Sequence, residues 1–257
     1  MTFRAARRLA WFIWEVGVIV VNYGFTAALA SSKNRRLARA AWLSRSSRRH
    51  LKIFGYSAAI SGPVPRSGLL ISNHLSYLDI LAICAAAPAV FVSKADVRRW
   101  PVFGWLAALG GTVFIERERR THVGAVNREI ETALADGALV VVFPEGTSSD
   151  GTGVLPFRAS LLEPALRGGH PISAAWIHYE LADGDARQEV CYWGDHTFLP
   201  HLLNLMGKKS VRATLRFATF NRTTDDRKEL ATQLREAVLK LKDAATGNPA
   251  CKAAGSG

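Results

Sequence analysis

A histidine and an aspartate separated by four residues mark the segment with the clearest chemical potential. The segment NHLSYLD (73–79) follows the apolar stretch GLLIS and precedes a second one, ILAICAAA. A carboxylate that holds one imidazole nitrogen as N–H leaves the other nitrogen free to accept a proton. The segment therefore predicts a general base, His74, oriented by Asp79, at the carboxyl end of a strand.

The same spacing occurs a second time, at His178 and Asp183. His178 falls inside an expected strand and Asp183 in a polar turn, so we interpret this second pair as a coincidence of spacing. Spacing alone leaves a second interpretation of His74 open, as a hydrogen-bonded structural histidine.

A second polar segment, FPEGTSS (143–149), directly follows the apolar stretch ALVVV. Glu145 is expected at the same sheet edge as His74, because reactive groups gather where parallel strands end. Gly146 allows a tight turn or a close backbone approach, and Thr147 and Ser148 offer hydroxyl donors. The alternative is a turn followed by a helix cap.

A third segment, GGTVFIER (110–117), reads as a strand that ends in a charged pair. Arg117 is expected at the same edge, where its guanidinium can bind a phosphate or carboxylate through two parallel hydrogen bonds. The alternative is a surface ion pair with a neighbouring glutamate.

These segments belong to a chain in which apolar strands alternate with helices, a pattern typical of α/β layers. We predict a mixed, largely parallel sheet flanked by helices over residues 56–243, and a disordered, small-residue tail at 244–257. The expected strands are 68–73, 89–94, 112–116, 138–143, 171–179, 189–193 and 211–220, and the expected helices are 78–87, 101–109, 119–135, 159–167 and 224–244.

Residues 1–55 are predicted to form a basic and apolar helical segment that associates with a membrane. Residues 1–60 contain eleven Lys/Arg, which flank the apolar stretch 9–30, and a single acid, Glu15, which lies within that stretch. This arrangement favours a membrane anchor over a nucleic-acid-binding arm.

Three interpretations of 9–30 stay open: a spanning helix, an interfacial helix or hairpin with a polar stripe at Arg8, Glu15 and Asn22, and a signal peptide cleaved after Ala30. Basic residues are more numerous after the stretch than before it. This places the body at the cytoplasmic face of the inner membrane.

Metal and disulfide chemistry are not expected. The three cysteines form no CxxC pair, and Asp195, His196 and His201, the nearest cluster of metal-ligand types, are expected in a loop.

Four segments taken together, NHLSYLD, VFIER, FPEGT and PISAAW, resemble in order and rough spacing the four motifs of the glycerolipid acyltransferase family, whose type member is 1-acyl-glycerol-3-phosphate acyltransferase. The resemblance implies His74 as general base, Asp79 as its orienting carboxylate, Arg117 as a phosphate contact, and Glu145 with Gly146 in acceptor binding. It also implies acyl-CoA or acyl-carrier-protein as donor substrate, and an N-terminal membrane-associating helical segment. We expect no separate cofactor, and membrane lipids as partners.

One position departs from the family pattern. Members that act on glycerol phosphates commonly read EGTR at the third motif, whereas this sequence has Ser148. Losing that cation should weaken phosphate binding, although Arg158 in LPFRASL could compensate. We expect 1-acyl-glycerol-3-phosphate as acceptor, with Asn73 and Thr147 also in acceptor binding. The alternative acceptor is lyso-ornithine lipid, because EGTSSDG followed by LPFRASL is similar to that bacterial branch.

The expected mechanism is direct transfer, with no acyl-enzyme, because no GxSxG elbow occurs and no cysteine neighbours His74 in the sequence. Backbone N–H groups near the 73–76 turn are expected to stabilise the oxyanion. The alternatives from other classes are a lipid hydrolase, a non-catalytic membrane-binding module and a nucleic-acid binder.

Overall fold

The computed structural model describes residues 2–26, 30–31, 34–100, 102–115, 120–163, 166 and 169–246. Its centre is a seven-stranded sheet in the order β1-β7-β6-β2-β5-β3-β4. The strands are β1 (Ser57–Ser61), β2 (Gly68–Ser72), β3 (Val90–Lys94), β4 (Val113–Ile115), β5 (Leu139–Val142), β6 (Ile172–Leu181) and β7 (Val211–Phe220).

Five neighbouring strands, β6, β2, β5, β3 and β4, run parallel to one another. β7 pairs antiparallel with β6, and β1 lies parallel to β7 at the edge. The predicted mixed, largely parallel sheet is therefore confirmed, including antiparallel pairing in the second half of the chain.

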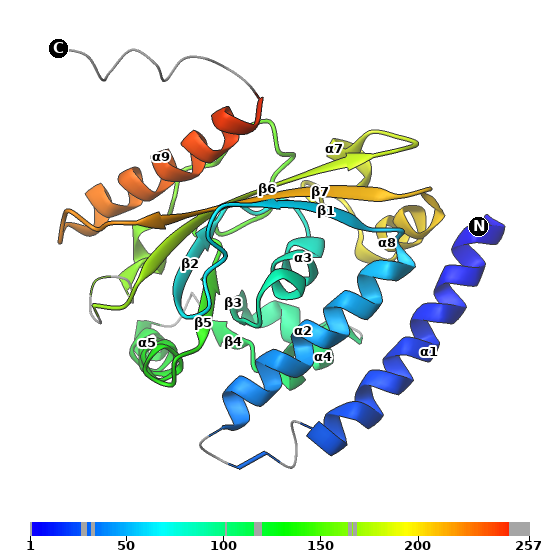
Figure 1. Ribbon diagram of the computed structural model, residues 1–257, viewed down its shortest axis with the longest axis horizontal. Helices are drawn as coiled ribbons and strands as arrows, with labels where there is room; N and C mark the ends of the chain where they lie inside the picture. The colour runs from blue at the N-terminus through cyan, green and yellow to red at the C-terminus, as the bar shows by residue number, and fades with distance from the viewer. Residues whose placement is uncertain are drawn as a thin grey trace.

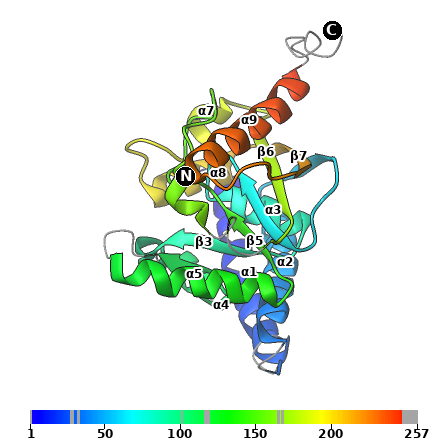
Figure 2. The same cartoon turned by 90° about the vertical axis from the view of Figure 1, so that its left-hand side faces the viewer.

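Helices cover both faces of the sheet, as Figure 1 shows. One face carries α1 (Phe3–Thr26), α2 (Arg35–Ile53), α3 (Leu78–Ala86), α4 (Phe103–Leu109) and α8 (Phe198–Gly207). The other face carries α5 (Arg120–Ala135) and α9 (Arg227–Thr246), which both lie towards the viewer in Figure 2. Each strand of the centre contributes alternate side chains to the two apolar layers, which explains why β2 is buried along its whole length.

Strand register brings two of the sequence motifs together. β2 and β5 are adjacent, with Ile71 opposite Val142. Because both strands run in the same direction, the segments that follow them, beginning at Asn73 and Phe143, leave the sheet at the same edge.

The N-terminal segment forms two antiparallel helices, α1 and α2, which pack on each other and on the body (Figure 1). Arg8 and Glu15, two members of the expected polar stripe, face the protein and are buried. The guanidinium of Arg8 donates to carbonyl oxygens at the end of α8, and Glu15 pairs with Arg49 at 2.6 Å. Asn22 is exposed.

Three local predictions were wrong. The expected strand 189–193 is replaced by α7 (Ala186–Glu189) and a loop, because the Asp185 side chain accepts from the Arg187 N–H and caps a helical turn. His201 lies in α8 and not in a loop. β1 was missed because this edge strand is exposed throughout and carries no buried apolar pattern.

The ends of other elements also differ from expectation. Among the described residues there are also two short 3₁₀ helices, η1 (Ala95–Arg99) and η2 (Ala159–Leu161). α9 continues through residues 244–246, which were expected in the tail. The remaining expected tail residues, 247–257, lie outside the described residues.

Candidate active site

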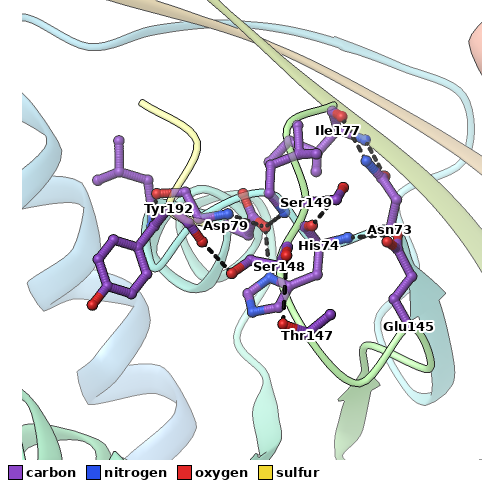
Figure 3. A network of polar contacts seen from close by, with 12 residues as sticks. Asn73, His74, Asp79, Glu145, Thr147, Ser148, Ser149, Ile177 and Tyr192 are labelled. Atoms are coloured by element: carbon purple, nitrogen blue, oxygen red, sulfur yellow. Dashed lines mark hydrogen bonds and ion pairs between the residues drawn. The ribbon is translucent and has the colours of Figure 1, made fainter. Parts of the chain in front are cut away.

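His74 lies at the carboxyl end of β2, in the turn that leads to α3. Its Nδ1 is 2.8 Å from Asp79 Oδ2, and its side chain is about one-fifth exposed. A carboxylate only accepts, so Nδ1 carries the proton and Nε2 is left with its lone pair. Figure 3 shows the two side chains facing each other, as the sequence predicts.

Asp79 is fully buried in the first turn of α3. Its Oδ2 also accepts from the backbone N–H groups of Leu75 (2.6 Å) and Ser76 (3.0 Å), and its Oδ1 accepts from the Tyr179 hydroxyl (2.8 Å). Four donors thus hold one carboxylate, which compensates its removal from water. This network fixes both the position of the carboxylate and the tautomer of His74.

The face of the imidazole is covered by Phe143, which comes directly after β5. The two rings stack with centroids 4.2 Å apart and planes 16° apart. The ring therefore has a hydrogen bond at one nitrogen and an aromatic contact on one face, and it keeps little freedom to rotate.

Glu145 supports the backbone at His74. Its Oε1 accepts from the His74 N–H at 3.0 Å, and the side chain is only 3% exposed. Burial raises the pKa of Glu145 to about 7. Glu145 is thus placed behind the His74 backbone, where it positions the turn.

A testable consequence concerns the pH dependence of folding. Burial raises the pKa of Glu145 from 4.5 to about 7, so the folded protein favours the protonated carboxyl. Folding is therefore not penalised by this group below pH 4.5, and the folded state loses stability as the pH rises from about 4.5 to 7 and the buried carboxyl must ionise. We expect the free energy of unfolding of the wild type to fall by up to about 3 kcal/mol relative to Glu145→Gln across this window. Denaturant titrations between pH 4.5 and 8 measure this difference, and parallel pH profiles of the two proteins would contradict it.

Asn73 connects two strands of the sheet. Its amide donates to the Ile177 carbonyl (3.0 Å) and accepts from the Ile177 N–H (2.8 Å), so it joins the end of β2 to β6. It is 1% exposed. These contacts occupy the side chain that was expected to bind the acceptor.

Ser148 and Thr147 follow the Gly146 turn and lie beside His74, as Figure 3 shows. The Ser148 hydroxyl donates to the Tyr192 carbonyl, which fastens the third motif to the loop after α7. The Thr147 hydroxyl makes only a long contact, 3.5 Å, with the Ser148 carbonyl. Gly146 has φ 75°, a conformation that favours glycine.

A cavity of about 320 Å³ begins at His74. Gly146, Thr147, Ser148 and Tyr192 line it beside His74, and most of the remaining wall comes from α1, α2, α3, β3 and α4. That wall is mostly aliphatic and aromatic. An imidazole with a lone pair at Nε2 thus borders an apolar cavity, which suits an apolar substrate whose reactive group lies at the imidazole.

Of the two arginines that were expected to bind the acceptor, the structure describes one, Arg158, and places it away from the cavity. Arg158 is exposed and lies outside the described lining of the cavity; its backbone N–H donates to the Pro144 carbonyl. Arg117 lies outside the described residues.

His178 and Asp183, the second pair with this spacing, have separate partners. His178 stacks on Trp176, with centroids 5.4 Å apart, and Asp183 accepts from the Lys209 N–H.

Sequence reasoning missed three contributors to the site: Tyr179, Tyr192 and the stacking role of Phe143. Phe143 lies inside the FPEGT segment, so a signal was present. Tyr179 lies 100 residues from Asp79 in the sequence and Tyr192 lies 44 residues from Ser148, and no local pattern marks either tyrosine.

Comparisons with known proteins agree with this geometry. The model of the Acyltransferase family matches residues 60–178. The lyso-ornithine lipid O-acyltransferase of Rhizobium meliloti is 32% identical over 230 residues, which cover 79% of this chain and 78% of the relative. The 1-acyl-sn-glycerol-3-phosphate acyltransferase of Neisseria meningitidis is 32% identical over 176 residues, which cover 68% of this chain and 69% of the relative.

A solved structure shares the fold. The 1-acyl-sn-glycerophosphate acyltransferase PlsC from Thermotoga maritima aligns with a TM-score of 0.63 at 18% identity, covering 94% of this chain and 98% of that protein. The relatives of this identity and coverage, together with the matched family model, show that this chain belongs to the acyltransferase family.

Proposed function

We propose that this enzyme transfers a fatty acyl chain from acyl-CoA or acyl-carrier-protein to the hydroxyl of lyso-ornithine lipid, in membrane lipid synthesis. The observation that carries the choice of acceptor is Ser148, whose hydroxyl is bound to the Tyr192 carbonyl. A phosphomonoester is best held by charged donors, and this position supplies none. Two relatives named lyso-ornithine lipid O-acyltransferase, from Rhizobium meliloti and Brucella abortus, support the same choice.

The second candidate acceptor is 1-acyl-glycerol-3-phosphate. Lys94 lines the cavity and offers a positive charge, and the Neisseria relatives carry the name of that activity. Both acceptors require the same transfer chemistry, so the difference between them lies in the head-group contacts.

The test offers both acceptors in equal amounts to the wild type and to Ser148→Arg, with one labelled acyl thioester. We expect the wild type to acylate lyso-ornithine lipid in preference, and Ser148→Arg to shift the product ratio towards phosphatidic acid by about tenfold, because a charge-assisted hydrogen bond is then available. Wild-type transfer mainly to 1-acyl-glycerol-3-phosphate would contradict the choice of acceptor and leave the transfer chemistry in place.

In the proposed reaction, His74 Nε2 takes the proton from the acceptor hydroxyl as its oxygen attacks the thioester carbonyl. The imidazolium that forms is stabilised by the Asp79 carboxylate at 2.8 Å. Collapse of the tetrahedral intermediate releases the thiolate, which takes the proton back from His74. The imidazole thus ends each turnover in its starting form, and the step needs no acyl-enzyme.

The oxyanion needs a donor other than the one expected from the sequence. The N–H groups of His74, Leu75 and Ser76 are already bound by Glu145 and Asp79. We therefore assign stabilisation of the oxyanion to the Thr147 hydroxyl. Thr147 lines the cavity, and its hydroxyl makes only the long, 3.5 Å contact with the Ser148 carbonyl.

The same proposal includes an in-plane position for α1 on the membrane. Among the described residues, α1 is the one helix long and apolar enough to cross a bilayer. Its buried stripe is fastened to the body through Arg8 and Glu15, whereas Trp14 (70% exposed) and Phe25 (75% exposed) face outward. A spanning orientation would break these polar contacts, so the outward face is best placed in the interface. The proposed location is the cytoplasmic face of the inner membrane.

Replacing that outward face tests the membrane position. Trp14→Glu with Phe25→Glu should lower binding to anionic vesicles by at least about tenfold, because two exposed aromatic side chains that would insert into the membrane become charged. Ile60→Glu on exposed edge strand β1 is the matched control, and it should bind as the wild type does. Vesicle sedimentation measures the fraction bound; equal binding of all three proteins would contradict the in-plane position.

A further inference from the structure

A second cavity, apart from the one at His74, has a strongly basic wall. Its volume is about 440 Å³, and residues from α2, η1, β4 and α5 and from the segment between α4 and β4 line it. Thr112 is the one described residue that lines both cavities. The charged residues of the second cavity are four arginines and two carboxylates: Arg35, Arg36, Arg39, Arg98, Glu129 and Asp136.

Two of these arginines are held in place by the protein. Arg39 donates to the Leu109 carbonyl at 2.7 Å and to the Ala108 carbonyl, at the end of α4. Arg36 donates to the Asp136 carboxylate at 3.0 Å. A guanidinium has five N–H donors, so both side chains keep donors for a ligand after these contacts are made.

The other two arginines bring positive charge that the described carboxylates do not pair. Arg35 and Arg98 make no ion pair with any carboxylate that the structure describes, and both are exposed. The Arg98 guanidinium lies over the Phe114 ring, 5.7 Å from its centroid, a contact that orients the group and uses none of its N–H donors. Positive groups gathered in one cavity repel one another, so an anion that binds among them relieves the repulsion.

The chemistry of this wall suits a phosphate group. Guanidinium groups bind phosphate oxygens through paired, charge-assisted hydrogen bonds. Four arginines against two carboxylates leave an excess of two positive charges, and a phosphate group carries one or two negative charges. The hydroxyl of Thr112, on the same wall, is a further possible donor.

The place of the cavity favours a phosphate that belongs to a lipid. Arg35 begins α2 at the end of the α1–α2 pair where α1 stops, the lowest part of the pair in Figure 1. Phe25, which is 75% exposed, lies at the same end of α1, on the face proposed to enter the membrane. Arginines at this level meet the surface where anionic head groups are concentrated.

We propose that this second cavity binds the phosphate of an anionic phospholipid, at a site distinct from that of the acyl acceptor. Arg35 and Arg98 supply the unpaired charge, and Arg36 and Arg39 supply the donors that are already fixed. The inference goes beyond the proposed acyl transfer and does not depend on which acceptor is acylated.

The experiment is isothermal titration calorimetry of the full chain in dodecyl maltoside micelles, with phosphatidylglycerol or phosphatidylcholine as the added lipid and no thioester. We expect saturable binding of about one phosphatidylglycerol per chain, and binding of phosphatidylcholine weaker by at least about tenfold. Arg35→Gln and Arg98→Gln should each weaken binding of phosphatidylglycerol about tenfold, because each removes a charged donor from the cavity.

Two neighbouring arginines provide matched controls. Arg45 on α2 and Arg99 on η1 are exposed and lie outside the described lining. Arg45→Gln and Arg99→Gln change the net charge by the same amount as the test variants, and they should bind phosphatidylglycerol as the wild type does. Equal weakening in all four variants would show attraction by the surface charge as a whole, and it would overturn the inference, as would the absence of saturable binding.

Two further measurements locate the lipid and identify the source of the phosphate. Lys94 lines the cavity at His74. Binding that is lost in Lys94→Gln but kept in Arg35→Gln and Arg98→Gln would place the lipid in the catalytic cavity and overturn the inference. Glycerol 3-phosphate that binds as tightly as the lipid, with the same dependence on Arg35 and Arg98, would overturn the assignment to a lipid. Because no acyl transfer is measured, failure of the proposed function would not change any of these results.

Discussion

His74→Ala is expected to lower the turnover number for acyl transfer on the order of a thousandfold, because general-base catalysis of this kind contributes roughly 10² to 10⁴. Asp79 binds the Nδ1 atom of His74, so the lone pair at His74 Nε2 stays available to accept a proton, and His74 lines the cavity. Initial rates with a labelled thioester in detergent or vesicles measure the loss, together with a circular dichroism spectrum to verify the fold.

The chain provides a matched control for this substitution. His178 has the same spacing to an aspartate, but it lies in β6 and stacks on Trp176. His178→Ala should keep transfer near the wild-type rate. A folded His74→Ala protein with wild-type turnover would show that the base is elsewhere.

Asp79→Ala is expected to cost about 3–5 kcal/mol of unfolding free energy, since removing one partner from a buried charged network leaves the others unpaired. Three N–H donors, from His74, Leu75 and Ser76, and the Tyr179 hydroxyl would lose their acceptor. Denaturant unfolding of the wild type and the variant measures the difference.

Asp79→Asn separates stability from catalysis at the same position. Three donors converge on Oδ2, so the amide oxygen of asparagine should occupy that place and its NH₂ should meet the Tyr179 oxygen. The His74 tautomer is then retained, but the charge that stabilises the imidazolium is lost. We expect a folded protein with turnover lowered about a hundredfold.

Tyr179→Phe is the matched control for this network, because it removes a single hydrogen bond to Oδ1. It should cost about 1 kcal/mol of unfolding free energy and leave most of the activity. If Asp79→Ala were as stable as Tyr179→Phe, the carboxylate would not hold the turn as described.

Local sequence predicted the parts of the site that lie within one strand, turn and helix. His74 and Asp79 are close because His74 follows the end of β2 and Asp79, five positions later, lies in the first turn of α3. Glu145 follows the adjacent strand β5 at the same edge. These relations depend on chain direction and strand order, which apolar patterns indicate well. The family motifs strengthened the same prediction, and the acyltransferase class is confirmed.

Contacts that depend on register and side-chain direction could not be predicted from the sequence. Tyr179 reaches Asp79 across 100 residues, and Asn73 turns to β6 and not to the cavity. Arg8 and Glu15 have the spacing of a polar stripe, but only the packing of α1 shows that this stripe faces the protein.

The central claim is that the acyl group passes from the thioester to the lipid hydroxyl without an acyl-enzyme. The most direct test follows a labelled acyl group from a thioester, with and without lyso-ornithine lipid. The label is then counted in lipid, in free fatty acid and on the protein. The account predicts label in the diacyl lipid only when the lyso-lipid is present, with little free acid and none held covalently by the enzyme. Release of free acid at the same rate in both conditions, or label retained on the protein, would contradict direct transfer to the lipid hydroxyl.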